Sequence, residues 1–98
     1  MVIKVFIKRV VPEDRAKEMI PLFRQMRILA TNQSGYISGE TLKSLDRPDS
    51  FLVISTWQSP EFWEKWLLNQ ERREIQDKID ALLCGRTEYE MFHYGFGE

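Results

Sequence analysis

The side chains of this chain that are best suited to chemistry are aromatic and lie close together. All three tryptophans, Trp57, Trp63 and Trp66, fall within the short stretch TWQSPEFWEKWLLN. Such side chains either fill a core or form the wall of a cavity for a flat apolar ligand, and both alternatives are open for Trp66. Trp57 is expected in the core or in a contact with a second copy of the chain. Trp63 is expected to be a partly exposed cover or a contact with that copy.

Polar groups that could act on a ligand are few. His93 is the only histidine, and imidazole is the side chain whose ordinary pKa lies near neutrality. It is either a hydrogen-bonded histidine of a sheet or a general base for a phenolic or quinol substrate. Tyr36 is a candidate hydrogen-bond donor to a substrate oxyanion. Arg27 is either solvated or reaches over the mouth of a pocket. Ordinary solvated charge is expected for Lys4, Lys8, Arg9, Arg72 and Arg73.

The residue inventory predicts no bound metal or organic cofactor. One cysteine, Cys84, and one histidine leave zinc or non-haem iron dependent on carboxylate ligands. The chain also has no glycine-rich turn between a strand and a helix, which flavin and nicotinamide sites require.

Charge and composition narrow the class of partner. Fourteen basic and fifteen acidic residues give a net charge of -1, which disfavours nucleic acid and an anionic membrane surface. Apolar residues make up 43% of the chain, enough for one packed domain over residues 1–98. The start Met1 to Lys4 does not read as a signal peptide, and the single Cys84 cannot form an internal disulfide, so we expect a cytoplasmic protein. The expected partner is a small apolar molecule or a second copy.

The first half of the chain predicts a strand, a helix and a second strand. Residues 2–10 alternate, with Ile3, Val5 and Ile7 on one face. Pro12 then opens a helix that ends at Asn32 to Gly35. The residues that form its buried stripe are Ala16, Met19, Phe23, Met26 and Ala30. Pro21 lies on the other side and predicts a local kink.

The second half repeats this order with the strand first. Residues 36–45 read as a strand with a bulge at Gly39, and residues 46–50 as a turn. Residues 51–57 are apolar on both sides, as in a covered strand. Ser59 and Pro60 begin a helix that the polar stretch 69–74 either divides or bends, and residues 87–95 form the last strand.

This order predicts a ferredoxin-like βαββαβ fold of the α+β class, an antiparallel sheet with both helices on one face. The opposite face would expose Phe6 between Lys4 and Lys8, together with apolar residues of the strand at 51–57. A broad apolar face in water favours aggregation. We therefore predict a homodimer through this open sheet face.

Three segments carry a resemblance to a known family. The chain start VFIKRVVPEDRAKE, the stretch Gly35 to Leu42, and the strand Phe51 to Ser59 resemble the antibiotic biosynthesis monooxygenase family of dimeric α/β-barrel proteins. The resemblance covers nearly the whole chain. It implies a dimer and oxygenation of a substrate without a bound metal or organic cofactor.

One branch of this family degrades haem and allows a sharper comparison. Its members use an asparagine on the first strand, a tryptophan on the second helix and an axial histidine. Trp66 matches the tryptophan, but Ile7 and Gln76 occupy the other two positions. Isoleucine cannot bond iron-bound oxygen and glutamine is a poor axial ligand, so haem degradation is disfavoured.

The resulting hypothesis is a cofactor-independent monooxygenase for a small aromatic or quinol-type substrate. Trp66, Phe23, Met26 and Ile7 would line the pocket, His93 would be the base and Tyr36 the donor. The alternative is a non-catalytic dimeric module that binds a small ligand or serves only as a structure. An enzyme for a small signalling molecule would have a smaller and more polar cavity. A hollow beside Trp66 with an ionisable group in it favours the enzyme.

Overall fold

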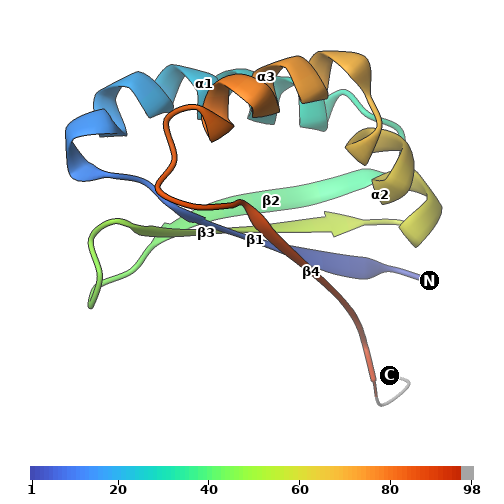
Figure 1. The fold of residues 1–98 in the computed structure, drawn as a ribbon. Coiled ribbons are helices and arrows are strands. Elements are labelled where there is room, and N and C mark those ends of the chain that lie inside the picture. Colours follow the sequence, from blue (N-terminus) through green and yellow to red (C-terminus); the bar gives the residue numbers. More distant parts are fainter. Residues whose placement is uncertain (96–98) are drawn as a thin grey trace.

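A computed structural model describes residues 1–95 as one antiparallel sheet covered on one face by helices (Figure 1). The strands are β1 (Ile3–Val10), β2 (Tyr36–Lys43), β3 (Ser50–Trp57) and β4 (Glu88–His93), in the order β2-β3-β1-β4. The helical elements are η1 (Glu13–Arg15), α1 (Ala16–Thr31), α2 (Pro60–Leu67) and α3 (Gln70–Asp80). This is the predicted ferredoxin-like α+β fold. The predicted domain ends at residue 98, and residues 96–98 lie outside the described part.

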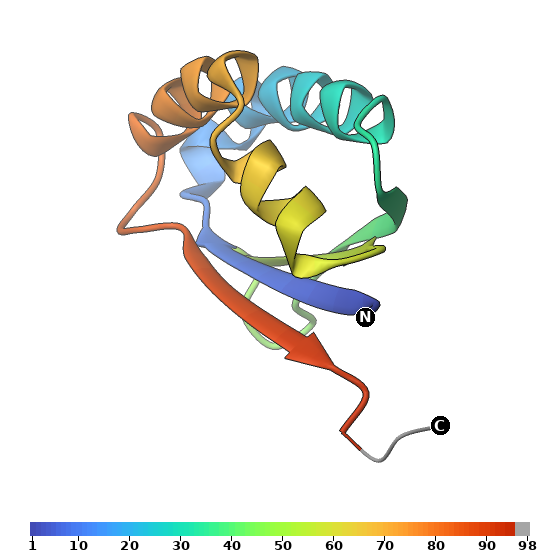
Figure 2. The same cartoon turned by 90° about the vertical axis from the view of Figure 1, so that its right-hand side faces the viewer.

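Strand β1 is central, and its alternation sets the two faces of the sheet. Ile3, Val5 and Ile7 are buried at 4%, 0% and 8% exposure and face the helices. Strand β3 pairs with one edge of β1 and β4 with the other. Figure 2 shows all three α-helices on the same side of the sheet. The apolar side chains between these layers form the core.

Helix α1 continues through Pro21, which lies inside it. The proline is exposed, so its ring meets solvent, and the helix is not broken, as predicted. Met19 at 1% exposure is the buried centre of the stripe, with Phe23 and Met26 packed beside it. The helix begins later than Pro12 predicts, because residues 13–15 form a short 3-10 turn first.

The helical segment after β3 consists of two helices, one of the two predicted arrangements. Asn69 separates them and caps α3, since its side chain accepts a 2.9 Å hydrogen bond from the backbone of Arg72. A side-chain oxygen at this position satisfies one of the free N–H groups at a helix start. The polar stretch 69–74 is therefore the first part of α3 and not a separate linker.

The irregularity in β2 lies earlier in the strand than predicted. Pairing with β3 shifts between Tyr36 and Ser38, and Gly39 pairs regularly with Ser55. The prediction of a bulge at Gly39 is therefore wrong. An alanine Cβ at position 39 would lie 2.5 Å from the Tyr36 hydroxyl, so the glycine makes room for that side chain.

All three tryptophans lie in the core. Trp57, Trp63 and Trp66 are exposed by only 0%, 2% and 4%. Both alternatives predicted for Trp63, a partly exposed cover and a contact with a second copy, are wrong, because residues three apart on a helix lie only about 60° from each other around its axis. Both tryptophans of α2 therefore face the sheet, where Trp63 meets the Trp57 ring at 5.9 Å.

The sheet face away from the helices carries the expected apolar side chains. Phe6 pairs with Ile54 across β1 and β3, and its ring lies 5.0 Å from that of Phe92 on β4. Leu42 and Phe92 are 44% and 45% exposed. None of the described helices is long and apolar enough to span a membrane.

Candidate functional site

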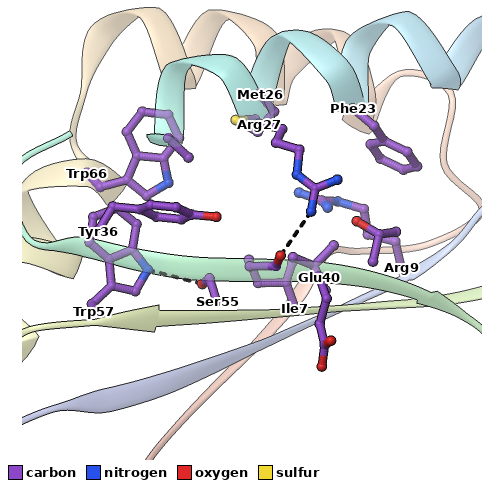
Figure 3. Close-up of a pocket in the computed structure, with 14 residues that line it drawn as sticks. Ile7, Arg9, Phe23, Met26, Arg27, Tyr36, Glu40, Ser55, Trp57 and Trp66 are labelled. Atoms are coloured by element: carbon purple, nitrogen blue, oxygen red, sulfur yellow. Dashed lines mark hydrogen bonds between the residues drawn. The ribbon is translucent and has the colours of Figure 1, made fainter. Parts of the chain in front are cut away.

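A pocket of about 80 Å³ lies between α1 and the helix-facing side of β1, β2 and β3 (Figure 3). Its lining consists of Ile7, Arg9, Phe23, Met26, Arg27, Ala30, Tyr36, Gly39, Glu40, Thr41, Val53, Ser55, Trp57 and Trp66. These residues come from five elements, β1, α1, β2, β3 and α2.

One end of the pocket is aromatic. The rings of Trp57 and Trp66 stack at 6.3 Å and 26°, and Tyr36 meets Trp57 edge-on at 5.3 Å. The indole nitrogen of Trp57 donates a 3.1 Å hydrogen bond to the hydroxyl of Ser55, which is itself buried. A buried indole N–H needs such an acceptor. The aromatic end is thus a packed and satisfied wall.

The Tyr36 hydroxyl is the polar tip of this wall. Figure 3 shows it pointing away from the tryptophans into the pocket. Strand β2 leaves space for it because Gly39 has no side chain at the point of approach. The hydroxyl can therefore donate to a ligand held against Trp66 and Met26.

The other end of the pocket is cationic. Arg9 is only 5% exposed, so the prediction that it is an ordinary solvated charge is wrong. Its guanidinium lies 5.3 Å from the Phe23 ring centre and donates a 3.0 Å hydrogen bond from Nη2 to Gln76 Oε1. Within residues 1–95, Arg9 Nε is buried and has no hydrogen-bond partner. Burial lowers the pKa of this guanidinium from its ordinary value, because desolvation disfavours the charged form.

A second arginine crosses the exposed side of the pocket. Arg27 reaches from α1 to β2, where its Nη2 donates a 2.9 Å hydrogen bond to the Gly39 carbonyl (Figure 3). The alternative in which Arg27 covers a pocket mouth is the one that the structure shows. Glu40 also lines the pocket, but its carboxylate points away from the two guanidinium groups (Figure 3).

A network of hydrogen bonds centred on Gln76 holds the Arg9 guanidinium. Gln76 accepts from Arg9, and its Nε2 donates to Asp80 at 2.8 Å and to Thr87 at 3.0 Å. The Tyr89 hydroxyl donates to Gln76 Oε1 at 3.3 Å. With both ends of its amide engaged, Gln76 holds the guanidinium in place and is not free to act as an axial ligand.

Arg72 belongs to the same buried region. It is 5% exposed and donates to the Tyr89 hydroxyl and, at 3.0 Å, to the Leu67 carbonyl. The prediction of a solvated Arg72 is therefore also wrong. Position 72 lies three and four residues before Ile75 and Gln76, so it shares the inward face of α3 with them.

His93 does not belong to this pocket. It pairs with Ile3 at the end of β4 and is exposed, and it is not among the lining residues. Strand β4 is an edge strand next to β1, whereas the pocket extends from β1 towards β3 and β2. The hypothesis of a histidine base requires His93 and Tyr36 to lie in one site. The structure does not bring them together.

The other residues predicted for the site do come together. Ile7, Phe23, Met26, Arg27, Tyr36 and Trp66 all line the one pocket. Arg9, Ser55 and Trp57 are among the lining residues that the prediction omitted. Arg9 had a signal in the sequence, because it continues the Ile3, Val5, Ile7 alternation of the inward face.

The fold and the pocket define a class of small α+β proteins with a ligand-sized hollow between helix and sheet. The family model for antibiotic biosynthesis monooxygenases matches residues 1–78. This range is most of the chain, and the chain therefore belongs to the antibiotic biosynthesis monooxygenase family.

Solved structures share this fold at low sequence identity. A conserved protein from Methanosarcina mazei Go1 is similar with a TM-score of 0.88 at 17% identity, over 94% of this chain and 91% of that one. SnoaB, a cofactor-independent oxygenase from Streptomyces nogalater, has a TM-score of 0.84 at 17% identity, over 95% and 92% of the two chains. Rv0793 from Mycobacterium tuberculosis has a TM-score of 0.86 at 12% identity, over 96% and 95%. Among curated proteins, none matches the sequence significantly.

Proposed function

We propose that this protein is a monooxygenase that works without a bound metal or organic cofactor on a small aromatic or quinol-type substrate. The observation that carries the proposal is the pocket beside Trp66, into which the Tyr36 hydroxyl and the Arg9 guanidinium are directed. Membership of the monooxygenase family supports it. So does the similarity of fold to SnoaB, which is described as a cofactor-independent oxygenase.

In this reaction the substrate itself supplies all the electrons. Ionisation of a quinol-type hydroxyl gives an electron-rich anion that reduces dioxygen. One oxygen atom enters the substrate ring and the other leaves as water with two protons, so that a quinol and O2 become a hydroxyquinone and water. The protein must provide an apolar pocket and stabilise the oxyanion.

The residues of the pocket match these two tasks. Trp66, Met26 and Phe23 form apolar walls, and the Tyr36 hydroxyl donates to the oxyanion. A nearby guanidinium lowers the pKa of a bound phenolic hydroxyl, since an opposite charge favours the ionised form. The proton of a sufficiently acidic substrate can then pass to water through the side that Arg27 spans. This route needs no histidine in the pocket.

Other functions have weaker support. A structural dimer without a ligand requires solid packing beside Trp66, whereas a hollow lies there. A binding module without turnover fits the same pocket and is separated from an oxygenase only by an activity measurement. Haem degradation remains disfavoured, because Ile7 offers the pocket no polar atom and Gln76 is held by four hydrogen-bonding partners.

The activity test uses metal-free protein and hydroquinone in oxygenated buffer at neutral pH. We expect oxygen uptake above the buffer rate, and one atom of ¹⁸O from ¹⁸O₂ in the product by mass spectrometry. Tyr36→Phe should lower the rate by about 100–1000-fold, the range found when one oxyanion donor is removed. Tyr94→Phe is the matched control, since Tyr94 is 58% exposed and lies outside the pocket. No uptake above buffer, or equal rates in the two variants, would count against the proposal.

We also propose that two copies associate through the sheet face that carries Phe6, Leu52 and Phe92. Burying such apolar side chains stabilises an interface by roughly 25 cal/mol per Å² of apolar surface. Light scattering at micromolar concentration should give the mass of a dimer, and Phe92→Lys should give a monomer. A monomeric wild-type protein would refute this. A cytoplasmic location remains the expectation for a chain with one cysteine.

A further inference from the structure

We infer that the substrate of this pocket is a single-ring aromatic carboxylate, with its carboxylate held between Arg9 and Arg27 and its ring against Trp66. This inference rests on the proposed function for the use of the pocket, but it concerns binding and is tested separately from turnover.

The first observation is an excess of positive charge. Arg9 is nearly fully buried, and its contacts are the neutral Gln76 amide and the Phe23 ring. The charge of Asp80 partly offsets the lowering of the Arg9 pKa, but within residues 1–95 Asp80 forms no ion pair with Arg9 and is joined to it by hydrogen bonds through Gln76. Charged groups that are buried in proteins are normally paired. At the cationic end of the pocket, Arg9 is therefore buried without a directly paired anion.

The second observation is a buried donor without a hydrogen-bond partner. Arg9 Nε is the buried side-chain nitrogen without a partner in the described chain. A buried donor left unsatisfied costs about 1–3 kcal/mol, and the fork of a guanidinium matches a carboxylate through two parallel hydrogen bonds. A ligand carboxylate satisfies this nitrogen and the charge together.

Arg27 and Tyr36 complete the polar end. Arg27 donates a hydrogen bond to the Gly39 carbonyl, and a Cβ added to the same glycine would lie 2.5 Å from the Tyr36 hydroxyl. Both groups therefore meet at one point of β2. The Glu40 carboxylate points away from this polar end (Figure 3). The polar groups that remain there are the guanidinium groups of Arg9 and Arg27 and the Tyr36 hydroxyl.

Shape selects the rest of the ligand. Ile7 and Val53, paired across β1 and β3, form an apolar floor between Arg9 and the aromatic wall. The two ends differ in character, so a ligand with one charged and one aromatic end is aligned along the pocket. The volume of about 80 Å³ is below the roughly 150 Å³ of a dry cavity that holds benzene, so the pocket has no room for a second ring. We therefore limit the ligand to one ring, which extends in part into the side that Arg27 spans, with its carboxylate between Arg9 and Arg27.

Calorimetric titration of the wild-type protein tests the charge directly. The probes are benzoate, its neutral isostere benzamide, and acetate, which has the charge without the ring. We expect benzoate to bind at least about 10-fold more tightly than either of the others, a difference of about 1.4 kcal/mol. Equal binding of benzoate and benzamide would overturn the carboxylate, equal binding of benzoate and acetate would overturn the ring, and no binding of benzoate would overturn both.

Variants locate the effect. Arg9→Met keeps an unbranched side chain without the charge and should abolish the preference for benzoate over benzamide. Arg27→Gln changes an exposed residue and should reduce the preference in a folded protein even if Arg9→Met does not fold. Arg24→Gln, on the exposed side of α1, is the matched control and should keep the preference. A preference that survives Arg27→Gln unchanged would refute the inferred role of Arg27, and one that survives Arg9→Met would refute that of Arg9.

The result is independent of the oxygenase assay. If oxygen uptake with hydroquinone is observed but benzoate shows no preference, only the inference on the carboxylate fails. If benzoate is preferred but no substrate is turned over, the protein is a binding module for aromatic acids and the proposed reaction fails.

Discussion

Gly39→Ala is expected to displace the Tyr36 hydroxyl from its position in the pocket. The new Cβ would lie 2.5 Å from the hydroxyl oxygen, while its distances to Tyr36 Cζ and to the Ile54 carbonyl are 3.5 and 3.6 Å. Ordinary contacts between heavy atoms lie near 3.5–4.0 Å, so the hydroxyl must withdraw by roughly 1 Å. The added Cβ thus clashes with one atom only, the Tyr36 hydroxyl oxygen.

The backbone at position 39 does not oppose the substitution, because within residues 1–95 the glycines with positive φ are Gly35 and Gly85. The cost arises from moving a ring that is held edge-on against Trp57. Overpacking of this kind costs about 1–3 kcal/mol. In a domain of this size each kcal/mol lowers the Tm by about 4–8 °C.

A double-mutant cycle separates this cause from any other effect of the alanine. Tyr36→Phe removes the one atom in conflict, so Gly39→Ala should cost less than about 0.5 kcal/mol in that background. We therefore expect a coupling of about 1–2 kcal/mol between the two positions, above the roughly 0.5 kcal/mol found for independent sites. The four proteins are unfolded in urea and followed by circular dichroism at one chain concentration, since association changes the apparent stability. Additive costs would refute the contact between Gly39 and the hydroxyl.

Three further predictions concern the core and the helices. Trp66→Ala removes the ring stacked on Trp57 and should lower the free energy of unfolding by about 3–5 kcal/mol in urea titrations; a loss below about 1 kcal/mol would mean that the ring is not packed as described. Ser55→Ala leaves the buried Trp57 indole N–H without its acceptor and should cost about 1–3 kcal/mol, whereas Ser38→Ala, at an exposed position of β2, should change the stability little. The pKa of Glu61 is lowered by hydrogen bonds from its own backbone N–H and from Ser59, so its stabilising effect should be present above the unfolded pKa and be lost as the pH falls through the folded one. Wild type and Glu61→Gln should therefore converge in Tm at low pH, and a gap that widens there would contradict the sign.

Local patterns predicted the architecture well because each element repeats its own period. The alternation in β1 and the 3-4 spacing of apolar residues in α1 each predict which face of the element is buried. Ile7, Phe23 and Met26 followed from those faces, and Trp66 followed from the resemblance. The position of the irregularity in β2 did not follow, because a glycine in a strand serves equally for a bulge and for a close approach, and only the Tyr36 ring decides between them.

Two arginines were misplaced for a different reason. Position 9 has the parity of Ile7 and position 72 the helical phase of Ile75, so the periods place both inside. A preference based on residue type alone places arginine in solvent. What the sequence does not show is the compensation, since Gln76 and Tyr89 become partners of these guanidinium groups only when α3 and β4 meet.

The hydrogen bond from Arg27 to the Gly39 carbonyl has a kinetic consequence. The group that crosses the exposed side of the pocket is one long, solvent-exposed side chain, and such a side chain changes its rotamer in picoseconds to nanoseconds. Exchange of small molecules with bulk water should then proceed far faster than in enzymes whose loops open on the microsecond to millisecond scale. The rate of turnover should then be limited by the encounter with dioxygen or by bond formation, and not by passage of the ligand past Arg27.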